Sequence, residues 1–405
     1  MPSKFTTQQV IRAWFLFSLL LFGIAAGLNM RIMEHGVEDN GLWAYAIIAT
    51  FFVWSLSGIK FLSPSYYLYR PPLPILCYSL FLFWSFISTL LYATAPTPAQ
   101  LLTNILWILL PLLVLIVSYN TVRNIGPSKW EVYVFCLIGL IVVFQYTLIF
   151  RELNIFLEHS HLASSYFSLY LLPLIFLSKS KYIRIFFVIL TAIVLISSVK
   201  RGGVLALALD MIAYVFCWAF VAKKLRLSTI VMGLSCIIVF SSIVYVMGTS
   251  DEVNNVFDRF ENMEEDQGSN RLLVWGITLK MIDNSDAINY MTGHGYNAVL
   301  ADSPIMLSAH NDILEITYDY GVIGIVLYLI SILAIIFYLI KLMWHKSEYA
   351  PPLAMMLAAY LSLSLMSHVM IYFFGNIVML TFGYIIGRYE YENMIIESGQ
   401  YNAKD

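Results

Sequence analysis

The sequence is poor in charge. Asp, Glu, Lys and Arg make up only 12% of its 405 residues, against roughly 25% in soluble domains. Hydrophobic residues make up 60%, more apolar surface than one soluble core can bury but well suited to a lipid bilayer. The formal net charge of −2 argues against nucleic acid as a partner. The composition therefore excludes an ordinary soluble domain and indicates an integral membrane protein.

The sequence also lacks the motifs of several reaction classes. We find no metal-site spacing, Asp-x-Asp pair, phosphate-binding Walker loop or nucleophile elbow. An ATP-driven reaction, a metal and an organic cofactor are therefore not expected. The cysteines lie inside apolar runs without metal or disulfide spacing, and we interpret them as small buried residues: Cys77, Cys136, Cys217 and Cys236.

Apolar runs of about 20 residues recur along the chain, as membrane-spanning helices require. They predict an all-α membrane protein with about twelve spans. The last two are the least clearly separated, because "SHVMIYFFGN" between them is a poor loop. The predicted spans are 11–29, 41–60, 72–93, 99–118, 131–150, 161–178, 184–199, 203–222, 228–247, 320–340, 351–367 and 370–387.

The connections predict one large external loop. Residues 1–247 hold the first nine spans, 248–319 form the loop, 320–387 hold the last three spans, and 388–405 form a tail. Of the 23 Lys and Arg residues, 16 fall on the side of the two termini and 7 on the side of the large loop. Basic residues favour the cytoplasmic side, so both termini are predicted to be cytoplasmic.

The stretch "SAHNDILEITYDYGVIGIVLYL", from Ser308 to Leu329, brings a histidine and several carboxylates to the start of a membrane span. Ser308 is a plausible helix N-cap, which would place His310 in the first turn. The positive end of the helix dipole disfavours an imidazolium there. A neutral His310 could act as a general base near pH 7. The alternative is a polar residue at the membrane surface with no catalytic role.

Asn311, Glu315 and Asp319 are spaced by four residues and share one helix face. Such a stripe is usually the solvated face of a helix. This one runs toward the bilayer, where a carboxylate needs a partner. A bound cationic group or an orienting role toward His310 is therefore the alternative reading.

Basic residues form the third candidate group. In "SSVKRGG", Lys200 and Arg201 lie at the external junction of two spans, where basic residues are scarce, and two glycines follow. Arg271 begins the amphipathic segment "RLLVWGITLKMI" on the same side. Arginine suits phosphate oxygens. The alternatives are side chains that extend to the lipid headgroups, or an ordinary surface arginine.

Other polar residues carry weaker signals. His294 lies between two glycines in the turn "TGHGYN" and is interpreted as structural, whereas Asp210, deep in a span, is either functional or a hydrogen-bonded structural acid. The remaining external residues give no specific pattern: Arg151, Glu152, His159, His161 and His368. One candidate base with external cations suits a substrate that arrives activated as a lipid-linked phosphate.

With its "KRGG", "NRLLVW", "GHGYN" and "HNDILEITYDYGVIGIVLYL" segments, the chain resembles the O-antigen ligase/polymerase superfamily over about residues 197–330. The resemblance implies a metal-independent glycosyltransferase of GT-C-like helical fold in the bacterial inner membrane. It implies undecaprenyl-diphosphate-linked sugars as donor and acceptor on the periplasmic face, with a chain-length regulator as a candidate partner. It assigns the essential histidine to His310 and the essential arginines to Arg201 and Arg271, with Lys200, Glu315 and Asp319 outside the firm match.

Polymerase and ligase differ in the acceptor that receives the glycan. A polymerase extends a lipid-linked glycan, whereas a ligase transfers it to the lipid A core. The stretch from His310 to Gly324 and the pI near 6.4 favour the polymerase. A flippase or small-solute transporter is a further alternative that Asp210 would suit, but we find no matched pair of interrupted helices, a usual transporter feature.

Overall fold

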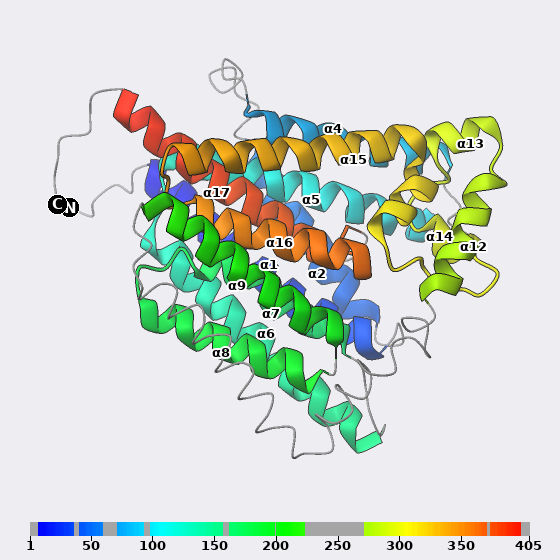
Figure 1. The fold of residues 1–405 in the computed structure, drawn as a ribbon, viewed down its shortest axis with the longest axis horizontal. Helices are drawn as coiled ribbons and strands as arrows, with labels where there is room; N and C mark the ends of the chain where they lie inside the picture. Colours follow the sequence, from blue (N-terminus) through cyan, green and yellow to red (C-terminus); the bar gives the residue numbers. More distant parts are fainter. Residues whose placement is uncertain are drawn as a thin grey trace.

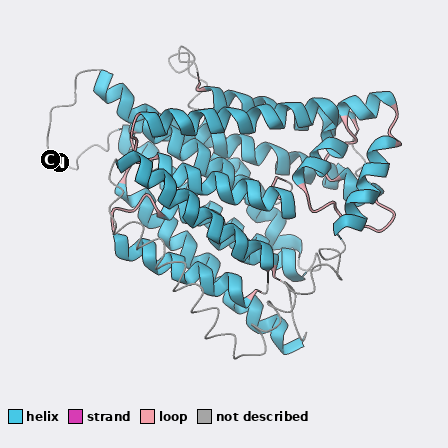
Figure 2. Cartoon of the chain, in the orientation of Figure 1, coloured by secondary structure: helices cyan, strands magenta, loops and turns pink. Residues whose placement is uncertain are grey.

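The structure is a computed structural model, and it describes residues 7–35, 40–59, 71–92, 98–156, 162–198, 200–222, 271–370 and 373–397. Within these ranges every regular element is a helix (Figure 2), as predicted. The elements are α1 (Thr7–His35), α2 (Asn40–Ile59), α4 (Leu73–Leu91), α5 (Pro98–Ile125), α6 (Lys129–Phe156), η3 (Ala163–Ser165), α7 (Tyr166–Ile175), α8 (Lys181–Ser197), α9 (Arg201–Ala222), α12 (Arg271–Asp283), α13 (Ala287–Thr292), α14 (Ala298–Asp302), α15 (Asp312–Trp344), α16 (Ala350–Met366) and α17 (Phe374–Glu397).

The long helices lie side by side in one bundle, and α12, α13 and α14 gather at one end of it (Figure 1). The closest packing joins α17 to α5, α16 to α9, and α15 to α4. On α17, Gly383 and Gly387 lie one turn apart. A Cβ atom at Gly383 would lie 2.1 Å from Ser118 Oγ, and one at Gly387 would lie 2.7 Å from the Tyr119 carbonyl oxygen. Small residues with this spacing let two membrane helices approach closely.

Six described helices are long and apolar enough to cross a membrane, so the chain is a multi-pass membrane protein. The predicted span 228–247 lies outside the described residues, and the count of twelve stays a prediction. The six are Gln8–Arg31, Leu73–Leu91, Leu101–Ile125, Lys129–Glu152, Gly202–Ala222 and Asp312–Trp344, and three shorter apolar helices are Ile48–Ser57, Ala163–Ile175 and Ala350–Met366.

Each end of the bundle carries a different set of arginine side chains. At the end where α17 finishes, Arg12 donates hydrogen bonds to the carbonyl groups of Ile125 and Gly126, and Arg388 lies over the Tyr349 ring. At the opposite end, Arg31 pairs with Glu152 at 2.7 Å. The residues that the sequence assigned to different sides of the membrane therefore lie at different ends of the bundle. The assignment of the first end to the cytoplasm remains a prediction.

Candidate active site at the start of α15

The candidate site lies at the end of the bundle that carries α12, α13 and α14 (Figure 1). Two short segments form its centre. We name residues 308–311, which lead into α15, the histidine loop. We name residues 367–370, which follow α16, the 367–370 loop.

Helix α15 begins at Asp312, with Asn311 as its N-cap. The Asn311 side-chain oxygen accepts hydrogen bonds from the backbone N–H groups of Ile313, at 2.9 Å, and Leu314, at 3.4 Å. The prediction that Ser308 is the N-cap is therefore wrong, and His310 lies before the helix rather than in its first turn. The physical reason is competition between two suitable caps: Asn311 has the extended backbone of a cap, whereas the Ser308 hydroxyl is used elsewhere.

The histidine loop is held on both sides by hydrogen bonds. The Ser308 hydroxyl lies 2.9 Å from His368 Nε2 in the 367–370 loop, and Trp275 Nε1 of α12 donates to the Ala309 carbonyl group at 2.9 Å. On the other side, Asp312 Oδ1 accepts from the Val369 N–H group at 2.9 Å. Segments far apart in the sequence thus fix one short loop.

His310 adopts a left-handed backbone, with φ of 52°. Few non-glycine residues adopt this conformation, and such strain is most often found at functional sites. Burial and the neighbouring His368, Arg271 and Lys200 side chains lower the pKa of His310 to about 3. This shift favours a neutral ring at pH 7. The prediction attributed this to the helix dipole, whereas burial and cationic neighbours are the causes in the structure.

Lys200 and Arg271 are far apart in sequence, yet both act electrostatically on His310. Arg201 is the first residue of α9, directly after Lys200, and its side chain lies outside the described residues. At Gly203, two residues further on, a Cβ atom would lie 2.7 Å from Leu195 Cδ2. Gly203 therefore allows α9 to approach α8 closely.

The predicted stripe of Asn311, Glu315 and Asp319 is buried, with Glu315 and Asp319 both at 0% exposure, so it is not a solvated helix face. Glu315 Oε1 accepts from the Ala309 N–H group at 2.5 Å and lies 3.2 Å from His368 Nδ1. Asn311 donates to the Leu365 carbonyl group at 3.4 Å. Of the three, Glu315 contacts both loops of the site, whereas Asn311 contacts the end of α16.

A family model with the description O-antigen ligase (Wzy_C) matches residues 186–329, which we name the O-antigen ligase segment. The predicted resemblance is thereby confirmed over this segment, and it indicates a glycosyltransferase-like or ligase enzyme of O-antigen synthesis. No curated protein matched the chain.

The O-antigen ligase segment contains much of the site but not all of it. Lys200, Arg271, His310 and Glu315 fall inside it, whereas His368 lies beyond its end. Sequence reasoning noted His368 only as an external histidine, and the poor loop "SHVMIYFFGN" was the one available signal. Its contact with Ser308 depends on the packing of α16 beside α15.

Residues 292–297, the glycine turn, also belong to the O-antigen ligase segment. They pack on a kink in α15 at Gly321, where φ is 69°. The Tyr318 and Asp319 carbonyl groups are turned outward at the kink and accept from His294 N at 3.1 Å and Gly295 N at 2.8 Å. A Cβ atom at Gly293 would lie 2.2 Å from the Asp319 carbonyl oxygen. Only glycine fits such an approach, so this turn is a structural element.

The side chains of Asp319 and His294 also join the glycine turn to α15. The Asp319 carboxylate accepts from the N–H groups of Asn297, at 2.8 Å, and Val299, at 3.1 Å. The His294 ring is stacked on Tyr318 at 4.0 Å between centroids. Both side chains therefore stabilise the glycine turn, which supports the structural interpretation of His294 and gives Asp319 an indirect part at most.

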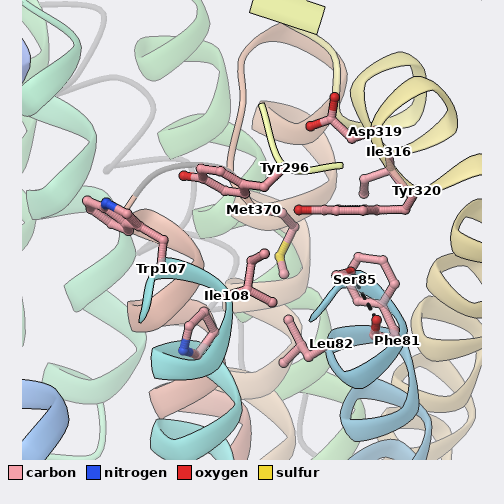
Figure 3. A pocket seen from close by; sticks show the side chains of 11 residues that line it. Phe81, Leu82, Ser85, Trp107, Ile108, Tyr296, Ile316, Asp319, Tyr320 and Met370 are labelled. Atoms are coloured by element: carbon pink, nitrogen blue, oxygen red, sulfur yellow. Dashed lines mark hydrogen bonds between the residues drawn. The ribbon is translucent and has the colours of Figure 1, made fainter. Parts of the chain in front are cut away.

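A pocket opens below the glycine turn, between α4, α5 and α15 (Figure 3). Its walls are mostly apolar and aromatic, Asp319 is their one charged side chain, and His310 is not among them. Its volume of about 10 Å³ corresponds to about one water molecule, so it has no room for a diphosphate in this structure. The residues around it are Phe81, Leu82, Ser85, Trp107, Ile108, Pro111, Tyr296, Ile316, Asp319, Tyr320 and Met370.

The other polar candidates lie apart from the site. Glu152 pairs with Arg31, and His159 and His161 lie outside the described residues. Asp210 is fully buried in α9, and neither carboxylate oxygen has a hydrogen-bond partner in the described part of the chain. Across the same residues, no group of three or more His, Cys, Asp or Glu side chains is placed to hold a metal ion.

Proposed function

We propose that the protein is an O-antigen polymerase, an inverting glycosyltransferase that joins undecaprenyl-diphosphate-linked repeat units on the periplasmic face of the inner membrane. One observation carries the proposal: the neutral His310 ring lies near two cationic side chains, Lys200 and Arg271, just before the N-terminus of the membrane helix α15. The family match over residues 186–329 supports the same reaction class. A GT-C-like fold and a reaction without metal are part of the proposal.

His310 is the general base in this proposal. It takes the proton of the acceptor hydroxyl group while that oxygen attacks the anomeric carbon of the donor sugar. The new carbon–oxygen bond forms as the bond from the anomeric carbon to the diphosphate breaks, and the diphosphate leaves with the bonding electron pair. Attack from the side opposite the diphosphate inverts the anomeric configuration.

The cations stabilise the leaving group. Lys200, Arg201 and Arg271 hold the diphosphate, and their charge lets it depart without an acid. Preorganised cations aimed at developing negative charge are among the strongest contributions to catalysis. Burial is the largest cause that lowers the pKa of His310, and the charges of Arg271 and Lys200 act in the same direction, so two of these cations serve both the donor and the base.

The membrane orientation is tested by cysteine labelling from outside. We expect a reagent that does not cross the membrane to modify a Ser269→Cys variant but not a Ser347→Cys variant, because the basic residues favour cytoplasmic termini. The reverse pattern would place His310 on the cytoplasmic side and overturn a periplasmic reaction.

The polymerase is separated from the ligase by the glycan profile of a deletion strain. Loss of a polymerase leaves one repeat unit on the lipid A core. Loss of a ligase removes the attached glycan and leaves lipid-linked polymer to accumulate. The description of the matched family favours the ligase as second candidate, and the pI near 6.4 favours the polymerase. A chain-length regulator is the expected protein partner of a polymerase.

A transporter or flippase is the remaining candidate, supported by the buried Asp210, whose carboxylate oxygens have no hydrogen-bond partner among the described residues. An Asp210→Asn variant separates the two readings, because it removes the charge and keeps the size. We expect it to retain polymer synthesis. Loss of lipid-linked substrate movement with intact transfer in detergent would favour transport instead.

A further inference from the structure

Three side chains form a line beside His310. Glu315 Oε1 lies 3.2 Å from His368 Nδ1, and His368 Nε2 lies 2.9 Å from Ser308 Oγ. Ser308 is 9% exposed, His368 1% and Glu315 0%. They come from the histidine loop, the 367–370 loop and α15, so the line ties three segments together away from solvent.

The direction of the hydrogens follows from the acceptors. Glu315 Oε1 accepts from the Ala309 N–H group at 2.5 Å. An ionised Glu315 can only accept, so with Glu315 ionised an attractive contact places the hydrogen of the His368 ring on Nδ1. His368 Nε2 then has a free lone pair and accepts from the Ser308 hydroxyl. Burial and the positive charge of Arg271 lower the pKa of His368 to about 3, which agrees with a neutral ring in one tautomer.

The line holds both the backbone and the ring of His310. Glu315 accepts from the backbone N–H groups of Ala309 and His310, which stabilises a chain with positive φ at His310. The His368 ring lies against the His310 ring, with 4.4 Å between centroids and 32° between planes. The imidazole of His310 therefore rests on a second imidazole, which is hydrogen-bonded to Ser308 through Nε2 and whose Nδ1 lies 3.2 Å from Glu315 Oε1.

We propose that His368 is a positioning residue, which Glu315 and Ser308 hold in place and which sets the angle of the His310 ring toward the acceptor hydroxyl. The inference rests on His310 as the base of the proposed function. A general base acts only within hydrogen-bond reach of the proton it removes, and a displacement of about 1 Å can cost about 10²-fold in rate.

The 367–370 loop is itself anchored to α15. Asp312 Oδ1 accepts from the Val369 N–H group at 2.9 Å and the Met370 N–H group at 3.4 Å. The carboxylates of Asp312 and Glu315 therefore fix the backbone and the ring of the same loop from the first turn of one helix. The 367–370 loop, which lies beyond the O-antigen ligase segment in sequence, thus supports the candidate base His310.

The test compares His368→Phe with His294→Phe in purified protein with a lipid-linked repeat unit. Both variants keep a ring, and His294→Phe is the matched control because its ring stacks on Tyr318 outside the site. We expect His368→Phe to lower kcat about 10²-fold, while the donor KM and the amount of folded protein stay unchanged. We expect His294→Phe to keep most activity.

The pH profile separates positioning from proton transfer. If His368 positions His310, the residual activity of His368→Phe still shows the acid limb that His310 produces. If His368 is itself the base, that limb disappears and the inference is overturned. A wild-type kcat in His368→Phe also overturns it, while an inactive His310→Ala measured alongside leaves the proposed base intact.

A Glu315→Gln variant gives a second measurement. It keeps the size of the side chain and weakens the hold on His368 Nδ1, so kcat should fall in the same direction as in His368→Phe. In the double variant, the increase in activation free energy should be smaller than the sum of the two separate increases, because both changes act on the His368 ring. Full additivity would contradict a shared role.

Discussion

The glycine turn and the histidine loop each place one histidine against an aromatic ring beside the same end of α15. His294 stacks on Tyr318 at 4.0 Å, and His310 lies on His368 at 4.4 Å. The turn fills a kink in the helix with hydrogen bonds, whereas the loop sets a strained histidine among cationic side chains. The comparison teaches that the neighbours, not the residue type or the ring contact, separate a structural histidine from a candidate base.

Replacement of the candidate base is expected to have the largest effect. His310→Ala should insert normally and lose about 10²–10⁴-fold in rate, the usual contribution of a general base. The measurement is polymer formation by purified protein from a lipid-linked repeat unit. A near wild-type rate would remove His310 from the chemistry and leave the histidine loop as a polar helix start.

Replacement of Arg271 by lysine is expected to have the next largest effect. The charge stays, but the planar fork that matches phosphate oxygens is lost. A hydrogen bond to a charged group contributes roughly 1.5–3 kcal/mol, so we expect kcat/KM to fall about 10-fold or more. The donor KM and kcat give the readout. Full activity of Arg271→Ala at normal protein level would take Arg271 out of the diphosphate site.

The pH dependence of activity tests the electrostatic surroundings of His310. A base works when deprotonated, so a pKa of about 3 leaves His310 active throughout pH 5–8, and activity is lost only as the pH falls toward that value. Burial is the largest cause that lowers the pKa of His310, and Arg271 and Lys200 add their charges. Lys200→Gln removes one of these two charges. The acid limb of kcat/KM should therefore move to higher pH, and an unmoved limb would contradict the contact.

The smallest effect is expected in the glycine turn. His294→Ala removes a ring from Tyr318 and a side-chain contact with Ser285, but it leaves the backbone hydrogen bonds at the kink. We expect most activity to remain, with a modest loss of thermal stability in detergent. A loss of activity as deep as that of His310→Ala, in folded protein, would erase the difference between the two regions.

Much of the fold could be predicted from the sequence. Apolar periodicity and length predicted helices at 72–93, 131–150 and 203–222, and α4, α6 and α9 lie there. The turn around His294 was also predicted, whereas the segment that begins at Arg271 was predicted only to be amphipathic and proves to be the helix α12. These features depend on local composition, because an apolar segment of sufficient length must pair its own backbone groups within a membrane.

The helix start could not be predicted as well. Ser308 and Asn311 are both good caps, and the sequence contains nothing that chooses between them. The structure chooses Asn311 because the Ser308 hydroxyl binds His368, 60 residues further along the chain. A contact of that range depends on how α15 and α16 pack.

The sequence by itself determined that this is a helical membrane protein, that its candidate base is His310, and that basic residues accompany it. Only the tertiary structure decided which groups surround that base. Glu315 contacts His368, Asp319 stabilises the glycine turn, and Lys200 and Arg271 lower the pKa of His310. The reason is that helix periodicity fixes which residues share a face, whereas the partner of each face depends on the packing of helices distant in sequence.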